Sequence, residues 1–524
     1  MFRRASLKAL IASTVVVGLI AVTGCSSDTG NADATPTARP TNGAASNGTA
    51  PPTAIPAGFE QWFDQQIAWG ACDDGAVNFE CATVSAPLSW HDPAVGEIEL
   101  ALRRHLALTE TYERQGSVLI NPGGPGGSGV DFVEMAPQMF GARLLDAFDI
   151  VGFDPRGVGQ SSQVRCLDDA AKDAALSADF DYDDAGLEAA RVALAYWAQA
   201  CLDNTGDLLG NVDTQSAARD MDLLRHLLGE ERLNFLGFSY GTQLGATYAG
   251  LFPSHVGAMV LDGGVDLTLT SEETSKGQAI GFENALRAYV TDCLAGPNCP
   301  LTGSVDDGLA QVRAILDEAF INPIPTTGNR VLTQTLAFFG MAVTLYDEAS
   351  WPFLSQGIDE VLTSGTGNIL MFLADFYFDR NPDGSFSSNT PEAFRAIGCL
   401  DGRASSDMDV MRALAAEIEA AAPTMGTFFG FGGLTCADWP FPVVAQEFDL
   451  TAAGAAPIVV IGTTGDPATP FEWSVGLANT LESGVLLTFE GEGHTAYGRS
   501  NRCIVDAVDA FFIDGVVPAA GKTC

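Results

Sequence analysis

The sequence predicts an α/β fold in which a mostly parallel central sheet is flanked by helices and carries a large, mainly helical cap domain, inserted before the last strands. Three observations lead to this prediction. Short apolar runs alternate with segments of helical length, several of these runs are apolar almost throughout, and one interval between them is too long for a single crossover helix. Strands buried on both faces of a parallel sheet have this near-continuous apolar character. The chain has 524 residues, of which 47% are hydrophobic, so it can bury a large core.

Seven segments are candidate strands. Each is a short run with several Val, Ile, Leu or Phe residues: 98–108, 117–121, 148–154, 234–237, 258–262, 457–462 and 485–489. Segments with a helical pattern lie between them, such as residues 214–228, in which Leu223, Leu224 and Leu227 share one face. Alternation of strands and helices is typical of a parallel sheet with both faces covered by helices.

Residues 267–456 interrupt the alternation. This interval of 190 residues is rich in helical pattern and aromatic residues and contains two pairs of cysteines. We expect it to form a cap over the carboxyl edge of the sheet, dividing the core into a first part, 59–266, and a second part, 457–524. An independent domain in tandem is the alternative, but the return of strand-like segments after residue 456 argues against it.

The first 58 residues do not belong to this fold. Residues 1–24 combine a basic start with an apolar stretch that is too short to span a bilayer. The small residues before Cys25 resemble a bacterial lipoprotein cleavage box, so we expect a lipoprotein signal peptide and a lipid on Cys25. The exported protein would be anchored to the outer face of the cytoplasmic membrane or cell envelope, or shed from it; an ordinary secretory signal is the alternative. Residues 25–58 are rich in small and polar residues and should form a disordered tether.

Ten cysteines remain when Cys25 is set aside, and an even number in an exported protein indicates disulfides. They follow one another along the chain in five neighbouring pairs: Cys72 and Cys81, Cys166 and Cys201, Cys293 and Cys299, Cys399 and Cys436, and Cys503 and Cys524. Five local disulfides are the simplest interpretation, although spacing does not determine the connectivity and buried free thiols are the alternative.

We expect no metal, no cofactor and no nucleic-acid partner. The sequence has no C-x-x-C pair, which disfavours a zinc ribbon or a thioredoxin-type site. Residues 379–384 match the start of a calcium loop, but Thr390 replaces the bidentate Glu at the last position, which favours a polar turn. With 66 acidic and 26 basic residues the formal net charge is −40, and such a surface repels nucleic-acid backbones.

A serine nucleophile is predicted at Ser239. It is the middle residue of Gly-Phe-Ser-Tyr-Gly at 237–241, which matches the pattern G-x-S-x-G. The pattern alone is weak in a glycine-rich chain, but here it follows the candidate strand 234–237 and opens a helical segment at 242–252. A nucleophile elbow requires this strand–turn–helix context, because the tight turn lifts the serine hydroxyl clear of the sheet.

A serine hydroxyl needs a base, and His494, just after the last candidate strand, is the best candidate among the five histidines. The other four lie in contexts that suit structural roles: His91, His105, His226 and His255. Asp466, after the preceding strand, would orient the imidazole and stabilise the imidazolium. Asp262, at the end of an earlier strand, is the rival acid.

Glycines at 121–129 predict an oxyanion hole. They follow the candidate strand 117–121, and backbone without side chains lets an N–H group approach a developing negative oxygen. We assign the two donors to the backbone N–H groups of Gly124 and Tyr240, with Gly123 as the near alternative to Gly124. A phosphate-binding loop is disfavoured by the missing G-K-[ST] ending and by the negative charge of the chain.

Together these motifs resemble the tripeptidyl aminopeptidase-like branch of the α/β-hydrolases, secreted or lipid-anchored serine exopeptidases of actinobacteria related to proline iminopeptidase. The resemblance extends from residue 67 to Cys524 and rests on motifs at 67–72, 121–127, 154–157, 237–241, 396–401, 465–470, and Gly493-His494 followed by Cys503. It implies an α/β-hydrolase fold, the triad Ser239, Asp466 and His494, and release of short peptides from free N-termini. Ser89-Trp90 replaces the Asp-Tyr that the family often has, which leaves the triad assignment unchanged.

The leading hypothesis is a cell-surface serine exopeptidase that releases di- or tripeptides from peptides with a free N-terminus through an acyl-enzyme. Such an enzyme must recognise an α-ammonium group, and Asp401 is a candidate for the recognising carboxylate, with a solvated surface aspartate as the alternative. Thr469 is a candidate hydrogen-bond partner for the loop of Asp466, with a simple turn-stabilising role as the alternative. A carboxylesterase or lipase acting on acyl esters with the same triad is the main alternative. A third hypothesis is a binding lipoprotein that has kept the hydrolase fold without activity.

Overall fold

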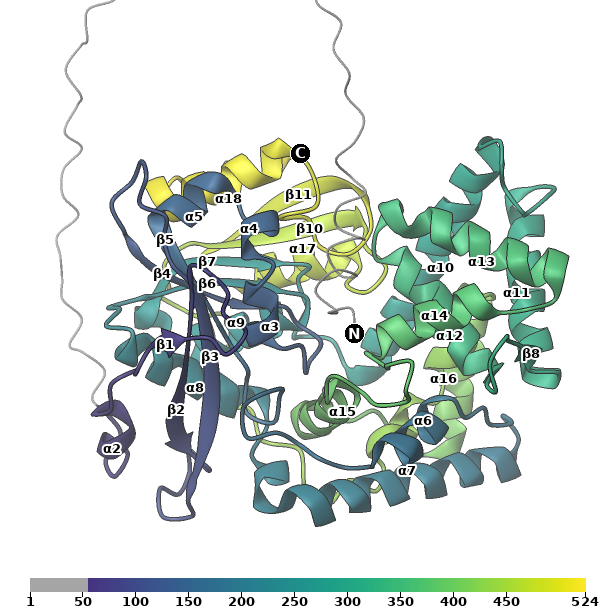
Figure 1. Ribbon diagram of the computed structural model, residues 1–524, viewed down its shortest axis with the longest axis horizontal. Helices are drawn as coiled ribbons and strands as arrows, with labels where there is room; N and C mark the ends of the chain where they lie inside the picture. The colour runs from purple at the N-terminus through teal and green to yellow at the C-terminus, as the bar shows by residue number, and fades with distance from the viewer. Residues whose placement is uncertain (1–54) are drawn as a thin grey trace, which may run out of the picture. The chain divides into compact units, whose positions relative to one another are not determined.

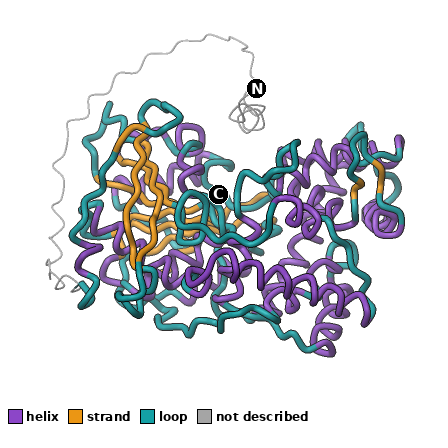
Figure 2. Tube along the Cα trace, turned by 60° about the horizontal axis from the view of Figure 1, so that its bottom comes forward, coloured by secondary structure: helices purple, strands orange, loops and turns teal. Residues whose placement is uncertain are grey.

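The computed structural model describes residues 55–524, and a ten-stranded sheet is its central feature (Figure 2). The strands lie in the order β1-β2-β3-β5-β4-β6-β7-β10-β11-β12. From β5 to β12 neighbours run parallel, whereas β1, β2 and β3 form an antiparallel edge. The bounds are β1 Gly70–Ala71, β2 Phe79–Pro87, β3 Glu97–His105, β4 Gly116–Asn121, β5 Phe148–Phe153, β6 Leu233–Phe238, β7 Val256–Asp262, β10 Ile458–Gly465, β11 Gly484–Glu492 and β12 Lys522–Thr523.

Strand side chains alternate between two cores, one on each face of the sheet. Val118 and Ile120 of β4 pack with one set of helices: α3 (Gly129–Val133), α4 (Ala136–Met139), α5 (Ala142–Ala147) and α18 (Arg502–Asp514). Leu119, between them, packs with the set on the opposite face: α8 (Thr214–Leu227), α9 (Tyr240–Leu251) and α17 (Phe471–Thr480). Both faces are covered, which explains why the strands are apolar almost throughout and confirms the predicted α/β fold class.

The interval between β7 and β10 forms a mainly helical cap with its own core, which includes Leu286, Leu336 and Leu370. Its elements are α10 (Ser271–Ala295), α11 (Val305–Ile321), β8 (Ile324–Pro325), β9 (Val331–Leu332), α12 (Gln334–Leu345), α13 (Trp351–Ser364), α14 (Asn368–Tyr377), α15 (Thr390–Asp401) and α16 (Met408–Ala421). The first helix begins at a capping box in which Thr270 and Glu273 satisfy each other's backbone N–H groups. Figure 1 shows α10 to α14 and α16 on one side of the sheet, with α15 nearer to α6 and α7.

Two helices from the first part of the chain pack against the cap. They are α6 (Asp169–Leu176) and α7 (Asp184–Thr205), which precede the elbow in sequence. Lys172 of α6 forms a buried ion pair with Glu392 of α15 at 2.5 Å, and Leu187 of α7 shares a small core with Met411. Trp197 and Cys201 of α7 also belong to the core on one face of the sheet, so these helices connect the first part of the chain to the cap. Figure 1 shows α6 and α7 near α15.

Short elements complete the chain: α2 (Glu60–Phe63) and the 3₁₀ turns Gly206–Gly210, Pro253–His255, Glu348–Ser350, Gly426–Phe429 and Gly432–Cys436. Five disulfides join the sequential pairs 72–81, 166–201, 293–299, 399–436 and 503–524. Phe59 is buried, at the start expected for the globular part. Across residues 55–524 no helix is both long and apolar enough to cross a bilayer. The predicted signal peptide, Cys25 and residues 25–54 of the tether lie outside the described residues.

Candidate active site

Ser239 occupies a strained turn between β6 and α9. Its backbone angles are φ 55° and ψ −123°, a combination that is costly for a residue with a side chain. A Cβ added to Gly237 would lie 2.3 Å from the carbonyl oxygen of Gly241, so side chains would clash where the turn doubles back. The strain and the small flanking residues are those of a nucleophile elbow.

Asp466 and His494 are paired just beyond the ends of β10 and β11, the first two strands after the cap. The Nδ1 atom of His494 lies 2.8 Å and 2.9 Å from the two carboxylate oxygens of Asp466. A carboxylate accepts hydrogen bonds, so the imidazole donates through Nδ1–H and keeps Nε2 available as a base. This is the orientation that a serine nucleophile requires of its base.

The carboxylate of Asp466 is held by its own loop. Its oxygens accept hydrogen bonds from the backbone N–H groups of Ala468 at 2.9 Å, Thr469 at 2.8 Å and Thr495 at 3.1 Å. The Thr469 hydroxyl donates a further bond at 3.1 Å, which is the contact expected for this residue. These donors fix the acid in place beside the imidazole.

The elbow and the loop of His494 converge at the end of β7. The backbone N–H of Ser239 donates to the carbonyl oxygen of Asp262 at 2.8 Å. The next residue, Gly263, adjoins the imidazole: a Cβ added there would lie 3.3 Å from Cε1 of His494. The three predicted triad residues therefore follow β6, β10 and β11, whose carboxyl ends lie at one edge of the sheet.

The glycine loop after β4 contacts the elbow. A Cβ added to Gly123 would lie 2.9 Å from Cβ of Ser239 and 3.2 Å from the backbone nitrogen of Tyr240. The N–H of Gly123 donates to the side chain of Asn121 at 3.0 Å, whereas that of Gly124 has no partner within residues 55–524. Gly123 is thus the loop residue that lies against the elbow, and the assignment of the oxyanion donor to Gly124 or to Gly123 stays a prediction.

We predict that Gly123→Ala lowers kcat by roughly 10²- to 10³-fold, the loss typical of a disturbed oxyanion hole. The new methyl group would lie 2.5 Å from the carbonyl oxygen of Phe238 and would push the loop away from the elbow. Gly454→Ala is the matched control, because Gly454 also has a positive φ but no atom within 4 Å of the added Cβ. Steady-state kinetics of both variants test this, and full activity of Gly123→Ala would contradict it.

The motif at 154–157 supports this loop. Buried Asp154 accepts hydrogen bonds from the Ser128 hydroxyl at 2.6 Å and the Val130 N–H at 3.1 Å, at the start of α3. Burial raises the pKa of Asp154 to about 6, against the lowering effect of those hydrogen bonds. Arg156 forms a fully buried ion pair with Asp220 at 2.7 Å. Asp154 therefore fixes the end of the loop at the start of α3, whereas Arg156 is bonded within the core.

Asp401 connects the cap to the helix of the elbow. Its carboxylate accepts hydrogen bonds from the N–H of Thr214 at 2.9 Å, from the hydroxyl of Thr214 at 2.5 Å and from Gln243 at 3.1 Å. The Thr214 hydroxyl also bonds the phenol of Tyr240 at 2.5 Å. Desolvation raises the pKa of Asp401 to about 7. Both oxygens are engaged by protein donors, and the proposed contact with an α-ammonium group stays a prediction.

A cap residue that the sequence did not single out contacts His494. The backbone carbonyl oxygen of Tyr346 accepts a hydrogen bond from the backbone N–H of His494 at 2.8 Å. The two aromatic rings meet edge to face, with their centroids 5.4 Å apart. Beside Tyr346 lies Tyr377 of α14, which is partly exposed together with Phe372 and Phe376. No local motif marks Tyr346, because its role depends on how the cap folds over the sheet.

The remaining candidates have other partners. Asp262, the rival acid, bonds the backbone of Ala496 and Tyr497, so Asp466 and not Asp262 is the acid paired with the imidazole. Among the other histidines, His255 bonds Asp222, His226 and His105 pack against phenylalanines, and His91 is exposed. The segment 379–384 is a hydrogen-bonded polar turn, as predicted.

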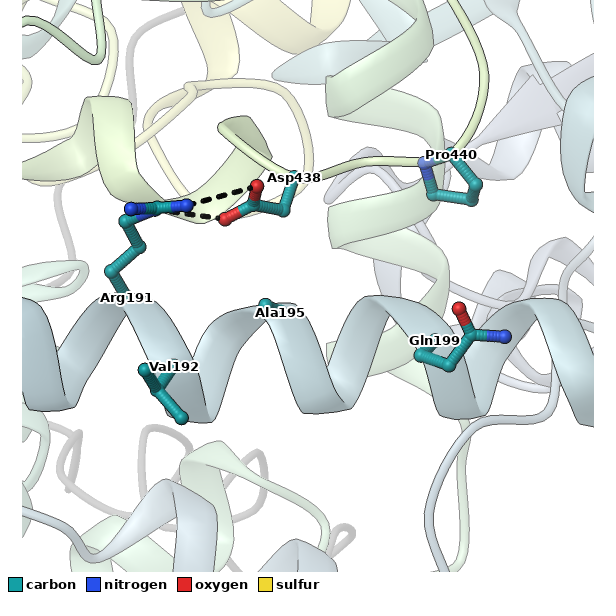
Figure 3. Close-up of a pocket in the computed structure, with 6 residues that line it drawn as sticks. All are labelled: Arg191, Val192, Ala195, Gln199, Asp438 and Pro440. Carbon is teal, nitrogen blue, oxygen red and sulfur yellow. Dashed lines mark hydrogen bonds and ion pairs between the residues drawn. The ribbon is translucent and has the colours of Figure 1, made fainter.

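A surface pocket of about 230 Å³ lies elsewhere, between α7 and the loop that follows the last 3₁₀ turn (Figure 3). It is lined by Val192, Ala195, Gln199, Pro440 and the ion pair of Arg191 with Asp438. None of these residues belongs to the predicted site.

Comparisons with known proteins identify the family. A family model described as TAP-like protein matches residues 422–524. The chain is 35% identical over 480 residues to the serine protease Hip1 of Mycobacterium tuberculosis, covering 88% of this chain and 91% of that protein. It is 37% identical over 476 residues to carboxylesterase B of the same species (88% and 90%). It is 30% identical over 458 residues to the tripeptidyl aminopeptidase of Streptomyces lividans (85% and 83%).

The protein is a serine hydrolase of the α/β-hydrolase fold. Its chain belongs to the tripeptidyl aminopeptidase-like family.

Proposed function

We propose that the protein is an exopeptidase that releases di- or tripeptides from free peptide N-termini by means of Ser239, His494 and Asp466. The observation that carries this proposal is a strained serine whose backbone bonds Asp262, next to Gly263, which adjoins the imidazole of His494. The Nδ1 of that imidazole is in turn bonded to a buried carboxylate. His494 takes the hydroxyl proton as Ser239 attacks the peptide carbonyl, and Gly124 and Tyr240 N–H groups stabilise the oxyanion. His494 then gives the proton to the leaving amine, and water hydrolyses the acyl-enzyme with the same base.

The peptidase specificity is supported by the names of two relatives, a serine protease and a tripeptidyl aminopeptidase. A cap that contacts the catalytic histidine through Tyr346 suits an enzyme that encloses the end of a chain. The alternative, a carboxylesterase acting on acyl esters, is supported by the relative of that name and by the exposed apolar rings of α14 next to Tyr377.

The test compares three substrates with soluble protein that lacks the first 25 residues. They are a tripeptidyl anilide with a free amine, its N-acetylated twin and a short-chain nitrophenyl ester. Cleavage of the free-amine peptide alone, lost in Ser239→Ala, supports the exopeptidase. Ester turnover with neither peptide cleaved would overturn it in favour of the carboxylesterase, and cleavage of the acetylated peptide would exclude a requirement for a free N-terminus.

We further propose that Cys25 is lipidated and anchors the enzyme to the cell envelope, so that its substrates are extracellular. The small residues before Cys25 support this, as do five disulfides, which persist in oxidising compartments. We expect the full chain to incorporate labelled palmitate in an actinobacterial host and Cys25→Ala to incorporate none. Equal labelling of both chains would contradict this proposal.

A further inference from the structure

The buried carboxylate of Asp262 holds the backbone that follows the catalytic histidine. Asp262 ends β7 and its exposed fraction is 0%. Its oxygens accept hydrogen bonds from the Ala496 N–H at 2.9 and 3.0 Å and from the Tyr497 N–H at 2.6 Å. These two residues come directly after Thr495 in the loop of His494, so the carboxylate fixes the loop that carries the imidazole.

The same residue holds the nucleophile through its backbone. Its carbonyl oxygen accepts the N–H of Ser239 at 2.8 Å, within the strained elbow. Asp262 is thus hydrogen-bonded both to the backbone of Ser239 and to the backbone of the loop that carries His494. A shift of about 1 Å between such groups can cost 10²-fold in rate, so this connection bears directly on catalysis.

The charge of Asp262 is also coupled to the site. Burial raises its pKa to about 6, while the hydrogen bonds from Tyr497 and Ala496 and the positive charges of Arg499 and His494 oppose that rise. The Tyr497 hydroxyl itself bonds Asp509 of α18. The attraction between two charges is mutual, so an ionised Asp262 favours the imidazolium that forms when Ser239 is deprotonated.

We propose that Asp262 is a positioning residue that joins the histidine loop to the nucleophile elbow, and that serine attack is fastest when its carboxyl group is ionised. The residue does not contact substrate and does not replace Asp466. This inference rests on the proposed roles of Ser239 and His494, but it does not depend on whether the acyl donor is a peptide or an ester.

The test measures the rate at which a fluorophosphonate labels Ser239 between pH 4.5 and 8. This probe reacts with an activated serine and needs no ammonium site, so it separates the triad from substrate specificity. General-base attack requires the loss of one proton, and the proposal adds the proton of Asp262, whose pKa burial raises to about 6. The logarithm of the labelling rate should therefore rise with a slope greater than one below about pH 6. Asp262→Asn should lower the slope to one and reduce the rate at pH 8 by about tenfold.

Asp509→Asn is the matched control. It removes another buried carboxylate, which accepts a hydrogen bond from the Tyr497 hydroxyl and not from the backbone N–H groups after His494. We expect it to keep the steep slope. A slope of one in the unmodified protein would overturn the inference even if Asp262→Asn fails to fold, and so would an Asp262→Asn profile that matches the unmodified one. If the unmodified protein is not labelled, or if Ser239→Ala is labelled equally, the proposed function falls and the inference with it.

Discussion

Ser239→Ala is expected to reduce kcat by about 10⁶-fold, because the methyl group cannot form an acyl-enzyme and the rest of the triad has no nucleophile to activate. The measurement is steady-state hydrolysis of whichever substrate the unmodified enzyme prefers. The fold should survive, since Ala at this position keeps the backbone bond from residue 239 to the carbonyl of Asp262.

Ser177→Ala is a suitable control for this prediction. Ser177 follows the end of α6, and its hydroxyl bonds only the carbonyl oxygens of that helix. Its replacement should leave kcat unchanged. Substantial activity of Ser239→Ala that persists after purification to homogeneity would show that another residue is the nucleophile.

Asp466→Asn is expected to reduce kcat by about 10⁴-fold, the effect of the corresponding change in other serine hydrolases. The amide oxygen could still accept the N–H bonds of Ala468 and Thr469. Its NH₂ group would then face the Thr495 N–H and the imidazole Nδ1, where the carboxylate now accepts. The imidazole would lose both its correct tautomer and the charge that stabilises the imidazolium.

The expected signature is a fall in kcat with little change in KM, because the lost interaction is strongest in the transition state. Asp449→Asn is the matched control: Asp449 makes similar local bonds, to the N–H and hydroxyl of Thr451, but lies on the surface. An Asp466→Asn enzyme that keeps most of its kcat would exclude Asp466 as the acid of the triad.

Asp466 and Asp262 show which parts of the site local sequence patterns can predict. Both are buried aspartates at the ends of parallel strands, and the sequence allowed either to be the acid. The structure separates them by the donors that meet each carboxylate: the imidazole of His494 for Asp466, and two backbone N–H groups for Asp262. Those donors come from a loop whose path no local pattern describes.

The sequence by itself determined the fold class, the elbow at Ser239 and the pairing candidates Asp466 and His494. These features follow from short-range physics: an apolar run buried on both faces, a turn too tight for side chains, and polar residues placed directly after strands. The tertiary structure alone decided that α6 and α7 contact the cap, that Tyr346 contacts His494, and that Asp401 bonds Gln243 of the elbow helix. Each of these depends on which surfaces meet when distant segments pack, and packing between distant segments has no local sequence signal.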